Sequence, residues 1–183
     1  MKTTIIANLE KYAHELPGKP AVCDKKRQLT YQELLFKVKR EAAILQEHGV
    51  RCTDKIAVLA VSGIEYVVSY LAIQYLGAVT VPLDKSLGLA AMEQICEQTQ
   101  VRLCLTNERQ RPAQVPFLSL KEIMQDVFED ESSYKKFPIN IQMISSSHLK
   151  CCLLVELQAC QRVLCFLIGQ FLQVWKIPQR EMD

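Results

Sequence analysis

Hydrophobic residues along the chain recur in two kinds of pattern, helical spacing and short uninterrupted runs. Helical spacing across residues 5–16 predicts a first amphipathic helix, and the same spacing across 31–45 predicts a longer helix that ends at Gly49. Residues 21–24 and 28–30 flank a charged turn, which is typical of a short hairpin with a solvated tip. We therefore expect the chain to begin with two helices joined by a hairpin.

Three short apolar runs, at residues 55–61, 78–82 and 101–105, are typical of strands buried on both faces of a parallel sheet. Helical spacing at 64–77 and around 90–96 separates these runs. Because strands and helices alternate, the sequence predicts right-handed parallel α/β units. The expected fold class is α/β, with a parallel sheet flanked by helices.

Two capping boxes mark helix starts along this pattern. Thr30 and Glu33 form the first, and Ser119 and Glu122 form the second, after a short strand at 117–118. In each box the hydroxyl accepts a hydrogen bond from a free amide, and the glutamate reaches back to the amide of the capping residue.

Composition excludes several classes of protein. Of the 183 residues, 49% are hydrophobic and the formal charge is only +2, which indicates a globular domain without a nucleic-acid surface. The N-terminus carries charge too early for a secretory signal, so we expect a cytoplasmic protein. The apolar runs at 151–155 and 163–168 are interrupted by polar residues, and we therefore expect no membrane span.

Eight cysteines raise the question of a disulfide framework or a metal site. In a reducing compartment, the cysteines of the helix and strand patterns are expected to be small core residues: Cys23, Cys52, Cys96 and Cys104. The other four crowd between residues 151 and 165 without two well-spaced ligand pairs, so no metal site is expected there.

Four segments, in this order, resemble the opening of the adenylate-forming (AMP-binding) superfamily, which includes acyl-CoA synthetases, luciferases and the adenylation domains of peptide synthetases. They are Leu29-Thr30-Tyr31-Gln32-Glu33-Leu34, Asp54-Lys55-Ile56-Ala57-Val58, residues 70–79, and Val81-Pro82-Leu83-Asp84. Thr53 departs from the family pattern, which often has glycine before the aspartate, but it affects only a turn. The resemblance covers residues 1–141 and implies part of the N-terminal subdomain of that fold.

In this family, a carboxylate attacks the α-phosphate of ATP to give an acyl-adenylate, and a thiol, often that of coenzyme A, then takes the acyl group. The resemblance thus implies ATP, Mg and coenzyme A for the intact family, with a small-molecule carboxylic acid as partner. A glycine-rich loop bearing a lysine, similar to TSGTTGxPKG, should follow soon after residue 141 to hold the phosphates.

That loop is missing from the sequence. Between Ser145 and Asp183 the chain has a single glycine, Gly169, although glycine is what lets backbone amides approach a ligand closely.

A change of reading frame would explain the missing loop. If the last base of each codon from Cys152 onward is joined to the first two bases of the next, permitted synonymous codons spell Phe, Thr, Ser, Gly, Thr, Thr, Gly, Met, Pro, Lys and Gly. We therefore expect a single frameshift near residues 140–142, so that 142–183 is an out-of-frame tail without a domain.

The leading hypothesis is a truncated AMP-dependent acid-CoA ligase, similar to long-chain fatty-acid-CoA ligases and inactive as this chain. It would lack the phosphate loop and everything C-terminal to it, so we assign no catalytic, cofactor-binding or metal-binding residue. One alternative is a fragment of an amino-acid or aryl-acid adenylation domain, and another is a non-catalytic interaction protein. Bare strand edges would favour aggregation or chaperone binding.

Overall fold

The computed structural model describes residues 4–25, 27–60 and 63–129. These residues belong to the first of two compact units, 1–141 and 142–183. The expectations for the segment after residue 129, including the out-of-frame tail, lie outside the described residues. The helices and strands of the first unit, in chain order, are α1 (Ile5–Glu15), β1 (Pro20–Cys23), β2 (Gln28–Thr30), α2 (Tyr31–Glu47), β3 (Lys55–Leu59), α3 (Ile64–Tyr75), β4 (Val79–Pro82), α4 (Leu89–Thr99), β5 (Leu103–Thr106), β6 (Phe117–Ser119) and α5 (Leu120–Glu129).

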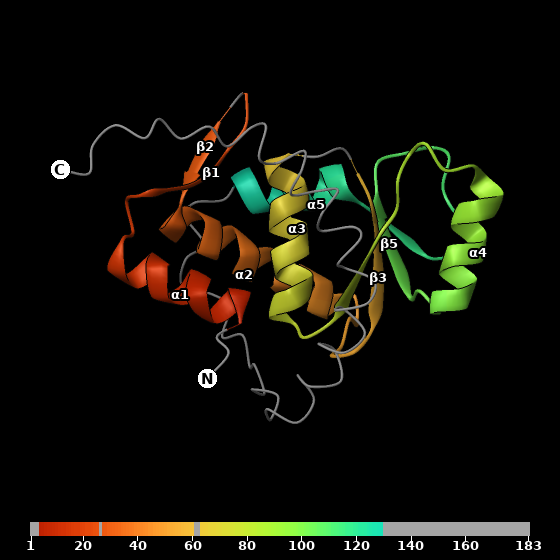
Figure 1. The fold of residues 1–183 in the computed structure, drawn as a ribbon, viewed down its shortest axis with the longest axis horizontal. Helices are drawn as coiled ribbons and strands as arrows, with labels where there is room; N and C mark the ends of the chain where they lie inside the picture. The colour runs from red at the N-terminus through yellow and green to blue at the C-terminus, as the bar shows by residue number, and fades with distance from the viewer. Residues whose placement is uncertain (1–3, 26, 61–62, 130–183) are drawn as a thin grey trace. The chain divides into compact units, whose positions relative to one another are not determined.

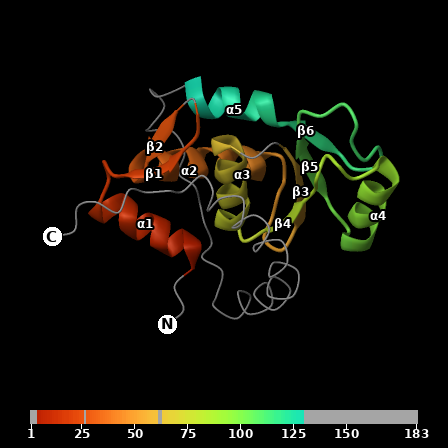
Figure 2. The same ribbon diagram turned by 45° about the horizontal axis from the view of Figure 1, so that its top comes forward.

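The main sheet has four strands in the order β4-β3-β5-β6, and all of its strand pairs are parallel. Helices α1, α2, α3 and α5 lie on one side of this sheet, while α4 lies on the other (Figures 1 and 2). The predicted α/β class, with a parallel sheet flanked by helices, is confirmed. The described residues contain no helix that is long and apolar enough to cross a membrane.

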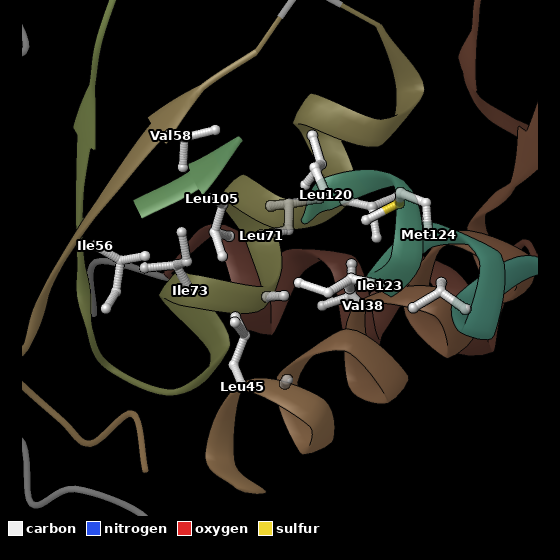
Figure 3. Packing of buried hydrophobic residues seen from close by; sticks show 14 of the residues in the cluster. Val38, Leu45, Ile56, Val58, Leu71, Ile73, Leu105, Leu120, Ile123 and Met124 are labelled. Atoms are coloured by element: carbon white, nitrogen blue, oxygen red, sulfur yellow. The ribbon is translucent and has the colours of Figure 1, made fainter. Parts of the chain in front are cut away.

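The larger hydrophobic core fills the space between the sheet and the helices α2, α3 and α5. Ile56 of β3 and Leu105 of β5 face Ile73 of α3, and Leu120 and Ile123 of α5 close the core (Figure 3). A smaller cluster on the opposite side joins the sheet to α4 through Ala57, Leu59, Leu83, Met92, Cys96 and Cys104.

Strand burial follows the position of each strand in the sheet. β3 and β5 lie inside the sheet, and all of their residues except the first of β3 are buried. The prediction of a strand buried on both faces was wrong for 78–82. β4 is one of the two edge strands of this sheet, so Val79 to Val81 are half-buried and Pro82 is exposed.

The predicted hairpin and both predicted helix starts are present. β1 and β2 pair antiparallel. The amide of Thr30 donates to Glu33 Oε2 at 2.8 Å, and the amide of Glu33 donates to Thr30 Oγ1 at 3.3 Å, which completes the first capping box. At α5 the amide of Glu122 donates to Ser119 Oγ at 3.3 Å.

In the predicted solvated turn of the hairpin, Lys25 is exposed as expected, but Arg27 is less solvated than predicted. Arg27 forms ion pairs with Glu65 at the start of α3 and with Asp24 in the same turn, and its side chain is only about one-third exposed, at 34%. These contacts attach the tip of the hairpin to α3.

The prediction of four core cysteines was half right. Cys96 and Cys104 are buried, but Cys23 is exposed and Cys52 is half-buried. Cys23 ends a strand of the two-stranded hairpin and Cys52 lies in the turn before β3, and neither belongs to the two hydrophobic clusters of the described residues.

Thr53 has a φ of 69°, the left-handed region that glycine adopts readily and threonine avoids. Its amide donates to the carbonyl of Gly77 at 2.9 Å, which holds the turn before β3 against the turn before β4. The departure from the family pattern at Thr53 therefore leaves the turn in place and stores backbone strain in it.

Candidate functional site

The carboxyl edge of the main sheet is where α/β folds place their ligands. The loops that follow β4 and β5 are the two described loops of this edge that carry the polar contacts given below. The hydroxyl of Thr106, only 1% exposed, accepts a hydrogen bond from the amide of Glu108 at 2.9 Å, and Asn107 Oδ1 accepts one from the amide of Lys121 at 2.7 Å. Lys85 pairs with Glu108 across the two loops.

Asp84 stabilises the conformation of the loop after β4. Asp84 Oδ1 accepts a hydrogen bond from the amide of Ser86 at 2.8 Å, and hydrogen bonds with Ser86 lower the pKa of this carboxyl. Asp84 therefore stabilises the turn as a carboxylate. The polar groups at this edge thus form hydrogen bonds and an ion pair within and between the neighbouring segments.

A hollow of about 180 Å³ lies between α2 and α5, lined by Arg40, Ala43, Ile44, Glu47 and Asp126. Pockets for small molecules usually have volumes of about 300–1,000 Å³. The hollow is thus too small to enclose a nucleotide or an acid substrate.

Nucleophiles and bases in the described residues are not arranged for catalysis. His14 is exposed on α1, and Nδ1 of the exposed His48 lies 2.9 Å from the carbonyl of Ile44. Burial raises the pKa of the Cys104 thiol to about 12, so the group stays protonated and unreactive at neutral pH. Within residues 4–25, 27–60 and 63–129, no group of three or more His, Cys, Asp or Glu could hold a metal ion.

Sequence reasoning missed the burial of two ionisable side chains of α2, Lys37 and Glu41, of which Glu41 is the more deeply buried. This side chain is 0% exposed, and burial raises its pKa to about 8. Ser69 of α3 is also 0% exposed, and its hydroxyl lowers the pKa of Glu41, which opposes the larger effect of burial. A signal was present in the sequence, because Glu41 falls on the same helical face as Leu34, Val38 and Leu45.

The chain is similar in sequence to three characterised proteins, each over a different share of its length. Enterobactin synthase component F from Escherichia coli O157:H7 is 31% identical over 120 residues, 64% of this chain and 9% of that protein. Tyrocidine synthase 3 from Brevibacillus parabrevis is 30% identical over 144 residues, 79% of this chain and 2% of that protein. 2-Succinylbenzoate–CoA ligase from Bacillus cereus is 28% identical over 127 residues, 69% of this chain and 26% of that protein. The chain thus spans about a quarter or less of the length of these relatives.

Solved structures show the same fold. The N-terminal subdomain of NpsA from Klebsiella oxytoca superposes with a TM-score of 0.64 at 20% sequence identity, over 70% of this chain and 34% of that chain. The same subdomain in complex with anthranilyl-AMSN superposes with a TM-score of 0.63 at 21% identity, over 68% of this chain and 33% of that chain.

The profile of the family described as AMP-binding enzyme matches residues 9–148, which include the strands from β1 to β6. Because this match extends over more than half of the sequence and the fold agrees with it, the chain belongs to the AMP-binding, adenylate-forming enzyme family.

Proposed function

We propose that residues 1–141 are the opening part of a domain that activates an amino acid or an aryl acid as its adenylate. The observation that carries this proposal is the similarity to enterobactin synthase component F and tyrocidine synthase 3, at 31% and 30% identity over 120 and 144 residues. The NpsA subdomain bound to anthranilyl-AMSN adds support for an aryl acid. These relatives favour the adenylation alternative over the long-chain fatty-acid ligase.

The proposed reaction joins the carboxylate of the acid to ATP. A carboxylate oxygen attacks the α-phosphorus, the bond from that phosphorus to the bridging oxygen breaks, and pyrophosphate leaves with the bonding electrons. Catalysis of this step depends on positioning and on neutralising phosphate charge. The described residues contribute the core and sheet that such a site is built on, and they supply no cluster that fits a Mg²⁺ ion.

The segment after residue 141 is proposed to be read out of frame, so that this chain does not itself activate an acid. The family match ends at residue 148, only a few residues beyond the proposed shift at 140–142. With permitted choices of the third codon base, the shifted frame can give glycines at the codon pairs Val155–Glu156 and Gln158–Ala159 and a lysine at Gln161–Arg162. Those are the residue types that a phosphate-holding loop needs.

ATP–pyrophosphate exchange tests both parts of the proposal. The purified chain should show no exchange with any acid, whereas a gene returned to the other frame at codon 142 and extended to its own stop codon should show exchange with amino or aryl acids. Replacing the restored loop lysine by alanine is the matched control and should abolish the gain. Exchange by the chain as it stands would refute the frame proposal, and exchange with long-chain fatty acids alone would refute the substrate class.

An acid-CoA ligase is the second candidate, favoured by the 28% identity to 2-succinylbenzoate–CoA ligase. The two candidates differ in the second half-reaction. If the restored protein forms a free acyl-CoA when coenzyme A is added, the ligase is correct, and if the adenylate persists in the presence of coenzyme A, the adenylation domain is correct.

A further inference from the structure

Helix α4 is attached to the sheet by fewer buried side chains than α2 or α3. It lies apart from the other helices, on the opposite side of the sheet (Figures 1 and 2). Only Met92 and Cys96 of α4 are buried, whereas α2 buries seven residues and α3 buries six. Both side chains belong to the smaller hydrophobic cluster. The amide of Ala113 adds a hydrogen bond to Glu93 Oε1, but at 3.5 Å it is at the weak end of the range.

The sequence of α4 makes it a weak helix in isolation. Eleven residues are too few for an isolated helix to be stable in water. Glu93 and Glu97 lie four residues apart, where like charges repel, and Glu97 lies near the C-terminus, where the helix dipole disfavours negative charge. Gly88 gives no side-chain cap at the N-terminus, and Gln100 after the C-terminus has a φ of 54°, which is costly for a residue other than glycine. The helix therefore depends on the small cluster for its stability.

Two cysteine thiols of this cluster report whether α4 is in place. Cys104 of β5 is 1% exposed and shares the cluster with Cys96 of the helix. Burial raises the pKa of both thiols, so neither forms the reactive thiolate while the cluster is closed. The neighbours of Cys104 along the strand, Leu103 and Leu105, belong to the larger cluster instead. Moving α4 away from the sheet would therefore expose Cys104 and leave the larger cluster closed.

We propose that α4 opens from the sheet as a separate flap while the larger cluster and its helices stay folded. Regions that open locally are those with few buried apolar contacts, and α4 meets that condition. The ion pair of Lys85 with Glu108 holds the start of the connection that precedes the helix. Residues 86–88 then serve as the hinge, because they are exposed apart from the half-buried Leu87.

Pulsed alkylation of the full-length chain with iodoacetamide, read by peptide mass spectrometry, measures this opening at Cys104. Low concentrations of urea should barely change the alkylation rate, because a local opening exposes little surface. Hydrogen exchange of the most protected α3 amides should accelerate steeply over the same range, because it requires the larger cluster to unfold. A Cys104 rate that rises with urea as steeply as this exchange would overturn the proposal, since the thiol would then be reached only by global unfolding.

Two variants should move the opening in opposite directions. Met92→Ala removes one of the two buried anchors, so alkylation of Cys104 and exchange of the α4 amides should rise at least about tenfold, with α3 exchange unchanged. Gln100→Gly relieves the left-handed conformation and should slow alkylation about threefold. Leu89→Ala is the matched control, because it removes an exposed apolar side chain from the same helix, and it should follow the wild type.

The variants also define the results that contradict the flap. Equal acceleration of exchange in α3 and α4 by Met92→Ala would show that α4 and the larger cluster open together. Gln100→Gly tests the flap even where Met92→Ala fails to fold, because it stabilises the helix. Unchanged or faster alkylation of Cys104 in Gln100→Gly would refute the proposal.

Discussion

Replacing Glu41 by glutamine should make the stability of the protein less dependent on pH. The pKa of Glu41 is raised from 4.5 to about 8, chiefly by burial. Below pH 4.5 the group is protonated in both the folded and the unfolded chain, so its contribution to stability is fully present. Between pH 4.5 and 8 the unfolded chain loses the proton and the folded chain keeps it, which favours unfolding by about 1.4 kcal/mol per pH unit.

The loss levels off above pH 8 because the carboxyl is then ionised in both states. The shift corresponds to about 5 kcal/mol in total, which is comparable with the whole stability of a small domain. Glutamine has a similar shape and no charge. The free energy of unfolding of Glu41→Gln should therefore rise steadily relative to that of the wild type from pH 5 to 8.

Urea unfolding followed by circular dichroism at pH 5, 6, 7 and 8 gives the measurement. The difference in unfolding free energy between Glu41→Gln and the wild type should grow with pH, while Glu47→Gln should stay parallel to the wild type. A difference that is constant across this range would refute the reasoning, because a carboxyl that ionises equally in both states produces no pH dependence.

Three further changes test the fold. Thr53→Gly should raise the free energy of unfolding by about 1 kcal/mol by relieving the positive φ, whereas Thr53→Ala should not, since alanine keeps the Cβ that causes the strain. Thr30→Ala should cost about 1 kcal/mol through loss of the helix cap, and Glu33→Gln should cost less because the amide oxygen can still accept from Thr30. Leu105→Ala, at a side chain that is 0% exposed between the sheet and α3, should cost about 3 kcal/mol, and a cost below 1 kcal/mol would contradict the placement of β5 inside the sheet.

The frame proposal concerns the segment beyond the described residues, which themselves have the family fold. The segments that resemble the superfamily coincide with α2, β3, α3 and β4, and these elements contribute many residues to the hydrophobic core. The chemistry was expected in a loop after residue 141, outside the described residues. The described residues therefore support membership of the family. That this chain has no catalytic, cofactor-binding or metal-binding residue remains a prediction.

Most of the element order could be read from the chain because the signals involved are local. The spacing of apolar residues in α2, the capping box at Thr30, the hydrogen bond of the Glu122 amide to Ser119, and the apolar run of β3 each depend on neighbours within a few positions. Hydrogen bonding within a helix turn and alternation along a strand act over that same distance.

Other features were decided by contacts between residues far apart in the chain. Strand order left β4 at an edge of the sheet, where one row of its backbone groups has no neighbouring strand among the described residues, and Pro82 is exposed there. The docking of the hairpin on α3 paired Arg27 with Glu65, and the packing of α3 on α2 enclosed Glu41 with Ser69. Periodicity along the sequence shows which face of a helix is apolar, but only packing determines how far water is excluded from a polar residue on that face.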